Sequence, residues 1–292
     1  LLVGTHALLT GTTRFSSLGL VITDEQHRFG VAQRSALSSK GRAVHTLVMS
    51  ATPIPRTLSL ILYGDLDISL IRELPPGRTP VSTYCIDSKK RERAFRFVRD
   101  RLDEGRQAYL VCPLVEESEK IDLAAAENRF EILQKTFGDK VGLVHGKMKE
   151  KEKDAVMERF KNGEIKLLVA TTVIEVGVNV PEATVMIVEH AERFGLAQLH
   201  QLRGRVGRGA HQSYCIMVNA SGEEDAGKRL DILNKSNDGF YIASEDLKLR
   251  GGGEILGTRQ SGAEQFRLAE MPEHQNLLIT ANKDARMIIA AD

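Results

Sequence analysis

Two acidic residues follow a short apolar run near the start of the chain. The run 20–22 (Leu-Val-Ile) precedes Asp24 and Glu25, and His27 comes two residues later. Such a run predicts a buried strand that ends at the carboxyl edge of a parallel sheet, where ligands bind in such folds. There Asp24 could hold a magnesium ion and Glu25 could orient an attacking water. Solvated carboxylates at an ordinary strand end are the simpler interpretation.

Ser50 and Thr52 stand at the end of a second apolar run, in the stretch TLVMSATPIPRT. Residues of these types at a strand end are often only turn formers. On their own they indicate a turn, and a functional role depends on the motifs around them.

The stretch QLHQLRGRVGRG, residues 198–209, combines arginines with glycines. If it is helical, Gln201, Arg205 and Arg208 lie on one face. Gly204 and Gly207 would then cost roughly 1 kcal/mol each relative to Ala, a loss that close approach of another chain or a ligand would explain. Two planar guanidinium groups suit the charge that develops on a transferred γ-phosphoryl group. The alternative is a basic surface patch.

The stretch LLVATTVIEVGVNVPEATVMIVEHAERFG predicts two strands joined by a loop. It could be an ordinary connection in which Gly177 and a following proline only mark the loop. In the functional interpretation, Thr171, Thr172, Glu175 and Gly177 form a hinge that senses both a nucleotide and a nucleic-acid backbone.

Eight apolar runs recur along the chain, with charged segments between them. Two of these segments, KKRERAFRFVRDRLDEG and KEKEKDAVMERFKNG, have the 3.6-residue period of helices, and the second places Val156 and Phe160 on one face. This alternation predicts parallel sheets covered by helices, so the fold class is α/β. The runs are LGLVIT, TLVMSAT, VSTYCI, AYLVCPLV, VGLVHG, KLLVATT, TVMIVEH and SYCIMVN.

A break in the pattern at RELPPGRTP divides the chain. We expect residues 1–76 to be the remainder of a first domain and residues 77–222 to form a complete second domain. Residues 223–292 read as an appended charged helix and a Gly-rich loop.

Composition limits the function classes. The net charge of +1 argues against a general attraction to polyanions, so nucleic-acid binding must come from locally arranged Arg and Lys. Cys85, Cys112 and Cys215 form no CxxC pair or Cys/His cluster, which argues against a metal site and a disulfide scaffold. We see no signal peptide or long apolar span, and therefore expect a cytoplasmic protein with no membrane partner.

The motifs resemble those of a known enzyme class when they are taken in order. DEQHRFG, SATPIPRT, HGKMKEKEKDAVMERFKNGEIKLLVATTVIEVGVNVP and QLHQLRGRVGRG resemble motifs II to VI of superfamily 2 helicases. Gln201, Gly204, Arg205 and Arg208 match motif VI residue by residue. The tail RLDILNKSNDGFYIASEDLKLRGGGEILGTRQSG, residues 229–262, is similar to the translocation motif of the RecG family of branch-migrating DNA helicases. The resemblance covers essentially the whole chain.

The resemblance implies an ATP-driven motor on double-stranded DNA that remodels stalled replication forks and Holliday junctions, with ATP and magnesium as cofactors. It implies RecA-like parallel sheets covered by helices: a truncated first motor domain, a complete second one, and a C-terminal helical hairpin and loop. Branched DNA is the implied partner, with single-strand binding protein as a further one. The implied site residues are Asp24 (magnesium), Glu25, His27, Gln201, Arg205 and Arg208 for catalysis; Ser50, Thr52, Glu175 and Gly177 for nucleotide binding; and Thr171, Thr172, Arg229, Arg250 and Gln260 for DNA movement.

Two alternatives stay open. A transcription-repair coupling factor has a similar translocation motif but acts on RNA polymerase; DEQH and GEILGTRQSG look more like the RecG family. A DNA-binding or partner-recruiting module without ATP hydrolysis would fit the lack of a P-loop, because G-x-x-x-x-G-K followed by Ser or Thr occurs nowhere in the sequence.

The position of Asp24 explains that lack if the chain begins inside a domain. Only 23 residues precede Asp24, and even one βαβ unit takes about 30. We therefore expect the P-loop half of the site, and the family's N-terminal wedge domain, to lie outside these residues. By itself the chain should hydrolyse ATP inefficiently.

Overall fold

The computed structural model describes residues 1–9, 13–24, 40–41, 44–51, 67–71, 73, 75, 77–113, 119–171, 180–250 and 275–291. Internal contacts divide the chain into two units, Leu1–Pro53 and Ile54–Asp292, and each is described by itself.

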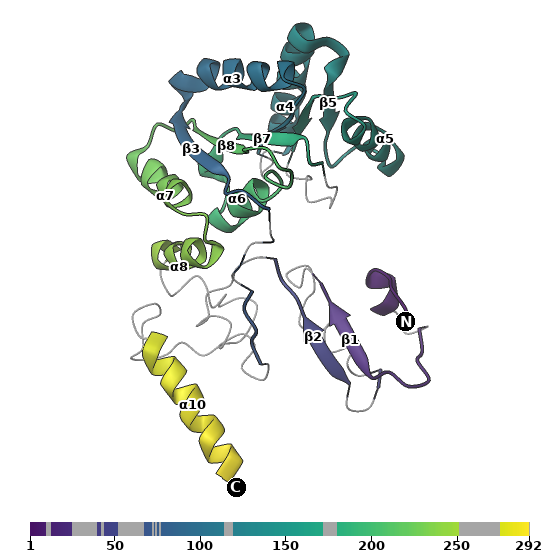
Figure 1. Ribbon diagram of the computed structural model, residues 1–292, viewed down its shortest axis with the longest axis vertical. Helices are drawn as coiled ribbons and strands as arrows, with labels where there is room; N and C mark the ends of the chain where they lie inside the picture. The colour runs from purple at the N-terminus through teal and green to yellow at the C-terminus, as the bar shows by residue number, and fades with distance from the viewer. Residues whose placement is uncertain are drawn as a thin grey trace. The chain divides into compact units, whose positions relative to one another are not determined.

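The first unit contains a two-stranded parallel sheet (Figure 1). A short 3-10 helix, η1 (His6–Leu9), precedes β1 (Leu20–Thr23), which pairs with β2 (His45–Val48). Burial alternates along β1, where Val21 and Thr23 are buried and Leu20 and Ile22 are exposed. This alternation shows that only one face of β1 is covered within the unit.

The second unit is built around a six-stranded sheet with the order β3-β8-β7-β4-β6-β5, in which every neighbouring pair is parallel. All eight apolar runs form strands, two in the first unit and six here, so the predicted α/β class is confirmed. The six are β3 (Ser82–Asp87), β4 (Gln107–Val111), β5 (Val141–Val144), β6 (Leu167–Ala170), β7 (Ala183–Val188) and β8 (Tyr214–Asn219).

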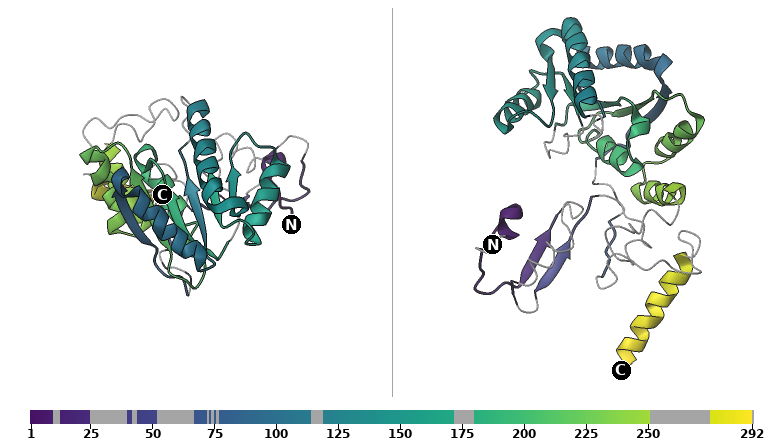
Figure 2. Two further views of the ribbon diagram at one scale, coloured as in Figure 1. Left: turned by 90° about the horizontal axis from the view of Figure 1, so that it is seen from above. Right: turned by 180° about the vertical axis from the view of Figure 1, so that it is seen from behind.

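Helices pack on both faces of this sheet (Figures 1 and 2). On one face, α3 and α4 contribute residues such as Val98 and Ala126 to a core. On the other, α5, α6 and α7 contribute residues such as Phe160, Leu199 and Leu233 to a second core. The predicted apolar face of α5 is confirmed, because Phe160 is fully buried and Val156 packs against the same core. The bounds are α3 (Arg91–Asp103), α4 (Glu119–Phe137), α5 (Glu150–Lys161), α6 (Leu196–Arg203) and α7 (Glu224–Lys235).

The central strands are covered on both sides. Every residue of β4 and β7 is buried, which is why these strands appear in the sequence as nearly continuous apolar runs. The buried amide of Gln107 in β4 is satisfied, because its Nε2 donates to the carbonyl oxygens of Phe160 and Ile165. This bond pair links the sheet to the end of α5.

Two helices after the sheet form the predicted hairpin. α7 is followed by α8 (Gly239–Arg250), and Leu230 of α7 and Ile242 of α8 lie in the same core as the sheet. The predicted domain limits after residues 76 and 222 stay predictions. No helix among the described residues is both long and apolar enough to span a membrane. The remaining elements are η3 (Ser88–Lys90), η5 (Gly138–Lys140), η6 (Ala191–Arg193) and α10 (Gln275–Ala291).

Candidate functional site

Asp24 follows β1, directly beside the end of β2. Thr23 and Val48 are the last paired residues, and the Met49 amide donates to the Thr23 carbonyl oxygen at 2.8 Å. Asp24 and Ser50 therefore follow neighbouring parallel strands, and both are exposed. A carboxylate and a hydroxyl at such an edge fit a magnesium ion, which prefers oxygen ligands. Glu25, His27 and Thr52 lie outside the described residues.

The helix that carries Gln201 is shorter than the sequence pattern indicated. α6 ends at Arg203 and Gly204 is its C-cap, so Arg205 and Arg208 lie in the loop that follows. The expectation of one helical face through all three predicted site residues is wrong.

Gly207 and Gly209 explain why this segment leaves the helix. Gly207 has a φ of 77°, in the left-handed region that favours glycine, and a Cβ there would lie 2.8 Å from the Cγ2 of Val81. A Cβ on Gly209 would lie 2.6 Å from the carbonyl oxygen of Pro181. Close approach within the same chain is therefore sufficient to account for Gly207 and Gly209.

Arg205 and Arg208 lie near Tyr109, on the face of the sheet that α6 covers. Burial raises the pKa of Tyr109 to about 12, and the positive charges of Arg208 and Arg205 partly oppose that rise. The Nε of Arg208 donates to the carbonyl oxygen of Gly204 at 3.3 Å, and the side chain is otherwise exposed. Arg205 and Gln201 are half-buried. The loop thus presents at least one guanidinium group to solvent.

Arg203 is a buried arginine that sequence reasoning missed, and it is only 3% exposed. Its Nη1 donates to the carbonyl oxygens of Leu233 at 2.8 Å and Ser236 at 2.9 Å, at the end of α7. Its Nη2 lies 2.9 Å from Nδ1 of His200, which must accept because a guanidinium group only donates. Burial, followed by the nearby charge of Arg203, lowers the pKa of His200 to about 4. The imidazole is therefore neutral, and Arg203 joins α6 to α7.

Arg229 makes a second connection, in the opposite direction. From α7 its Nη1 donates to the carbonyl oxygen of Phe194 at 2.9 Å, and its Nη2 to that of Glu192 at 2.5 Å. Both carbonyl groups belong to the segment that leads from η6 into α6. Arg229 therefore contacts the chain itself at a point that fixes α7 against α6. Arg250 is the last residue of α8, and Gln260 lies outside the described residues.

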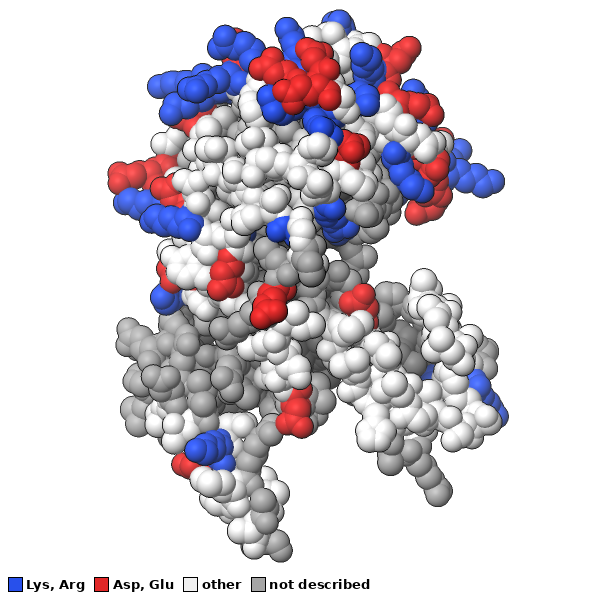
Figure 3. Space-filling model, viewed as in Figure 1, with Lys and Arg blue, Asp and Glu red and all other residues white. Residues whose placement is uncertain are grey.

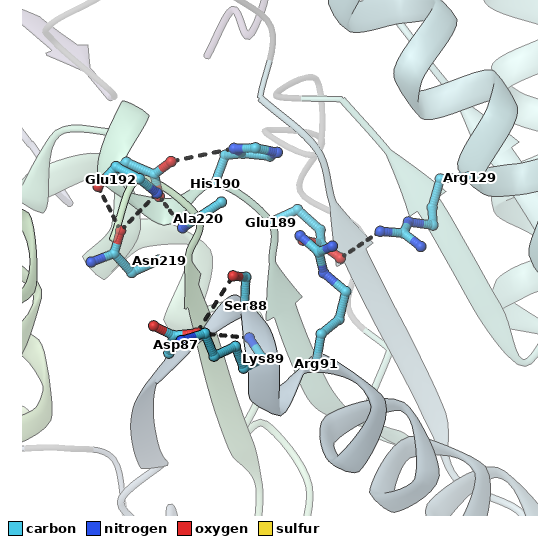
Figure 4. Close-up of polar contacts among 11 residues, drawn as sticks. Asp87, Ser88, Lys89, Arg91, Arg129, Glu189, His190, Glu192, Asn219 and Ala220 are labelled. Atoms are coloured by element: carbon cyan, nitrogen blue, oxygen red, sulfur yellow. Dashed lines mark hydrogen bonds and ion pairs between the residues drawn. The ribbon is translucent and has the colours of Figure 1, made fainter. Parts of the chain in front are cut away.

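Glu189 lies just after β7 and is held by two arginines (Figure 4). Its carboxylate pairs with Arg91 of α3 at 2.8 Å and with Arg129 of α4 at 3.2 Å, and its side chain is 4% exposed. The next residue, His190, has a left-handed backbone with φ 49° and ψ 48°, and its Nδ1 lies 3.3 Å from Glu192. The ion pairs thus fix both helices of one face to the carboxyl edge of the sheet.

Thr171 follows β6 at the same carboxyl edge. Its amide donates to the carbonyl oxygen of Val144 at 3.2 Å, which extends the pairing with β5. Its side chain is fully buried, and its Oγ1 has no hydrogen-bond partner among the residues that the structure describes, a rare state for a buried hydroxyl. Thr172, Glu175 and Gly177 lie outside the described residues.

Residues 222–228, Gly-Glu-Glu-Asp-Ala-Gly-Lys, have the spacing of a P-loop, but Arg229 stands where Ser or Thr is required. In the structure Gly222 precedes α7 and Gly227 lies inside the helix, so no phosphate-cradling loop forms. The Nζ of Lys228 pairs with the carboxylate of Glu224 at 2.9 Å. This stretch is therefore a helix start with acidic residues.

Histidine, cysteine and acidic side chains are dispersed in the part of the chain that the structure describes. There, no three His, Cys, Asp or Glu residues gather as metal ligands. Cys85, Cys112 and Cys215 form no disulfide. Burial raises the pKa of Cys85 and of Cys215 to about 12, which leaves both thiols protonated.

Comparison with known families matches two segments of the chain. The helicase conserved C-terminal domain family matches residues 89–210. The C-terminal part of domain 3 of the ATP-dependent DNA helicase RecG matches residues 236–292.

Among proteins, the chain is similar over its full length to RecG of Synechocystis sp. (53% identity over 294 residues) and of Bacillus subtilis (49% over 294 residues). It spans 35% and 43% of those two proteins. Among structures, it resembles RecG bound to a three-way DNA junction, with 45% identity, a TM-score of 0.72, and coverage of 94% of this chain and 35% of that one.

A yeast Dbp5 bound to RNA and ADP BeF3 shares the fold alone, at 16% identity, with a TM-score of 0.52 and coverage of 78% of this chain and 58% of that one. The RecG matches, by contrast, include both the sheet and the helices that follow it. The chain therefore belongs to the RecG family of ATP-dependent DNA helicases and corresponds to their C-terminal portion.

Proposed function

We propose that this chain supplies a motor domain and a DNA-moving element of an ATP-driven translocase on double-stranded DNA. The translocase remodels branched DNA, including Holliday junctions and stalled replication forks, in recombination and repair. The observation that carries the proposal is the likeness, at 45% identity over 94% of the chain, to a RecG bound to a three-way DNA junction. ATP with magnesium supplies the energy when bound.

We assign nucleotide roles to residues of both units. Asp24 holds magnesium, which its exposed position after β1 allows. Glu25 orients the attacking water, and Arg205 and Arg208 bind the γ-phosphate, as suits guanidinium groups in phosphoryl transfer. His27 and Gln201 complete the catalytic set, and Ser50, Thr52, Glu175 and Gly177 contact the nucleotide.

The link from nucleotide to DNA rests on the two arginine connections between α6 and α7. Arg203 joins the end of α6 to the end of α7, and Arg229 joins α7 to the segment before α6. Because these helices are tied in both directions, a shift of the Arg205–Arg208 loop is passed to α7 and α8 as a rigid displacement. Thr171, Thr172, Arg229, Arg250 and Gln260 are the residues we assign to DNA movement.

The 292-residue chain by itself should not hydrolyse ATP efficiently. Its sequence has no P-loop, and residues 222–228, which have the spacing of one, lie at the acidic start of α7. We place the activity in the cytoplasm, with branched DNA as the principal partner and single-strand binding protein as a second one.

The test uses the product of the complete reading frame, with ATP hydrolysis and junction unwinding measured on a synthetic three-way junction. Replacing Arg205 or Arg208 by Gln should lower kcat on the order of a thousandfold, as expected for arginines that stabilise the transferred phosphoryl group, and should leave junction affinity nearly unchanged. Arg96→Gln, at an exposed position of α3, is the matched control. Equal activity of Arg208→Gln and the control would remove Arg208 from the catalytic set.

The same protein, assayed also for release of a stalled RNA polymerase, separates the two other functions. Release of stalled RNA polymerase without junction unwinding would indicate a transcription-repair coupling factor. DNA binding by the complete protein without ATP hydrolysis would indicate a non-hydrolysing recruiting module.

A further inference from the structure

A surface groove with a volume of about 490 Å³ lies along β3, the edge strand of the six-stranded sheet. It opens between β3, the start of α3 and the end of α7, and none of the proposed catalytic or DNA-moving residues lines it. The volume falls in the range of small ligand pockets, roughly 300–1,000 Å³. The apolar part of its wall consists of Tyr84, Ile86, Ala94, Phe97, Tyr214 and Ile216.

The groove exists because α3 leaves the outer end of its sheet face uncovered. Tyr84 and Ile216 are directly opposite each other in the β3–β8 register, yet Tyr84 is 51% exposed. The ring of Phe97 meets that of Tyr214 edge to face, with centroids 4.9 Å apart, and forms a firm side wall. An aromatic and aliphatic surface of this kind, recessed but open to water, is typical of a binding site on a soluble protein.

The rim of the groove is basic. Lys90 and Arg93 line it, and Lys89, Arg93 and Arg96 are exposed at i, i+4 and i+7 along η3 and α3. Figure 3 shows Lys and Arg side chains gathered over α3 at the upper left of the view. Residues 87–97 contain five Lys or Arg and two acidic residues, in a chain whose net charge is only +1. The positive charge is therefore local to the groove.

The two acidic residues of segment 87–97 do not cancel its positive charge. The Oδ1 of Asp87 accepts from the Lys89 amide at 2.7 Å and caps η3. Glu92 lies on the first turn of α3, where a carboxylate is favoured by the helix dipole. Arg91 is already paired with Glu189, so the exposed cations that remain for a partner are Lys89, Lys90, Arg93 and Arg96.

We propose that this groove docks a short acidic peptide segment of a partner protein. One aromatic or long aliphatic side chain of the peptide sits between Tyr84 and Phe97, and its carboxylates pair with Lys90 and Arg93. An extended peptide can also add to the outer edge of β3, the last strand of the described sheet, by main-chain hydrogen bonds. Asn234 lies on the opposite rim. The recessed apolar wall favours a side-chain anchor over a nucleic-acid backbone, which needs only the cations.

Fluorescence anisotropy of the 292-residue chain with labelled probes tests this proposal. The probes are a peptide with several aspartates around one phenylalanine, the same peptide with that phenylalanine replaced by alanine, and a short single-stranded oligonucleotide. We expect the phenylalanine peptide to bind at least tenfold more tightly than the alanine peptide, and its binding to weaken with salt.

Two variants locate the binding. Arg93→Glu and Tyr84→Ala should each weaken peptide binding at least tenfold. Lys151→Glu, an equivalent charge reversal at an exposed position of α5, should not. Unchanged thermal unfolding confirms that each variant folds. Failure of the phenylalanine peptide to bind, equal binding of the alanine peptide, or equal weakening by Lys151→Glu overturns the proposal. If Arg93→Glu weakens binding of the oligonucleotide but not of the peptide, the proposal is also overturned, and the groove is assigned to nucleic acid. None of these outcomes bears on ATP hydrolysis.

Discussion

Replacing Arg203 by Met should loosen α7 and α8 from α6 without unfolding the sheet. The guanidinium group is buried and donates to the carbonyl oxygens of Leu233 and Ser236 at 2.8 and 2.9 Å. Methionine has a long, flexible apolar stem that can fill much of the same space, but it cannot donate. Two carbonyl groups at the end of α7 therefore lose their partner.

The expected size of the effect follows from those two bonds. A hydrogen bond to a charged group contributes about 1.5–3 kcal/mol, and part of that sum is offset because the variant no longer buries a charge. A net loss of about 3 kcal/mol is a reasonable expectation. At about 1.4 kcal/mol for each factor of ten, this equals roughly a hundredfold increase in local opening.

Amide hydrogen exchange followed by mass spectrometry measures that opening directly. In Arg203→Met, protection of α7 and α8 should fall by about two orders of magnitude, while protection of α4 in the same sample should change by less than threefold. Arg96→Met, at an exposed position of α3, should leave both regions as they are. Unchanged protection of α7 and α8 would show that the two bonds do not hold the hairpin. An equal loss everywhere would show that Arg203 stabilises the whole unit, and the local reasoning would be wrong.

Four further substitutions test the geometry around the loop and the sheet edge. The pKa of His200 is lowered from 6.5 to about 4, so between these pH values the unfolded chain binds more protons than the folded one. The free energy of unfolding should therefore fall by up to about 3 kcal/mol as the pH drops from 6.5 to 4. In His200→Asn the melting temperature should depend less on pH over this range, and an unchanged pH dependence would contradict a neutral histidine. Glu189→Gln leaves two arginines without their shared carboxylate and should cost about 3 kcal/mol in urea unfolding; a loss below about 1 kcal/mol would mean that the arginines regain full hydration. Gly207→Ala should lower the free energy of unfolding by about 2 kcal/mol or more, since it combines a positive φ with a 2.8 Å contact. Gly204→Ala, at φ −67°, should lower it by less than about 1 kcal/mol. Equal effects of the two substitutions would contradict the loop geometry.

The sequence was sufficient for the strands because of how parallel sheets bury their residues. β6 and β7 are covered on both faces, so each appears as a nearly continuous apolar run rather than an alternating one. The helices α3 and α5 were equally accessible, since their buried residues recur with the helical period along charged segments. These elements are encoded locally, within a dozen or so residues.

The end of α6 was not predictable from helical period alone. Gln201, Arg205 and Arg208 have helical spacing, but Gly207 meets Val81, more than one hundred residues earlier in the sequence. The positive φ of that glycine is a tertiary requirement, and a Gly-rich stretch in a sequence does not say whether a ligand or the chain itself comes close. The same holds for Arg203, whose carbonyl partners lie 30 and 33 residues away.

The arginines also show why net charge was a weak guide to DNA binding. Arg91, Arg129, Arg203 and Arg229 are committed to internal carboxylates or carbonyl groups, so their charge holds the fold together and is largely unavailable to phosphates. The motif match selected Arg229 but not Arg203, although both make the same kind of contact between α6 and α7. A DNA-moving role for Arg229 therefore requires transmission through the protein rather than direct contact with a phosphate. Replacement of either arginine should then impair DNA movement while leaving DNA affinity largely intact.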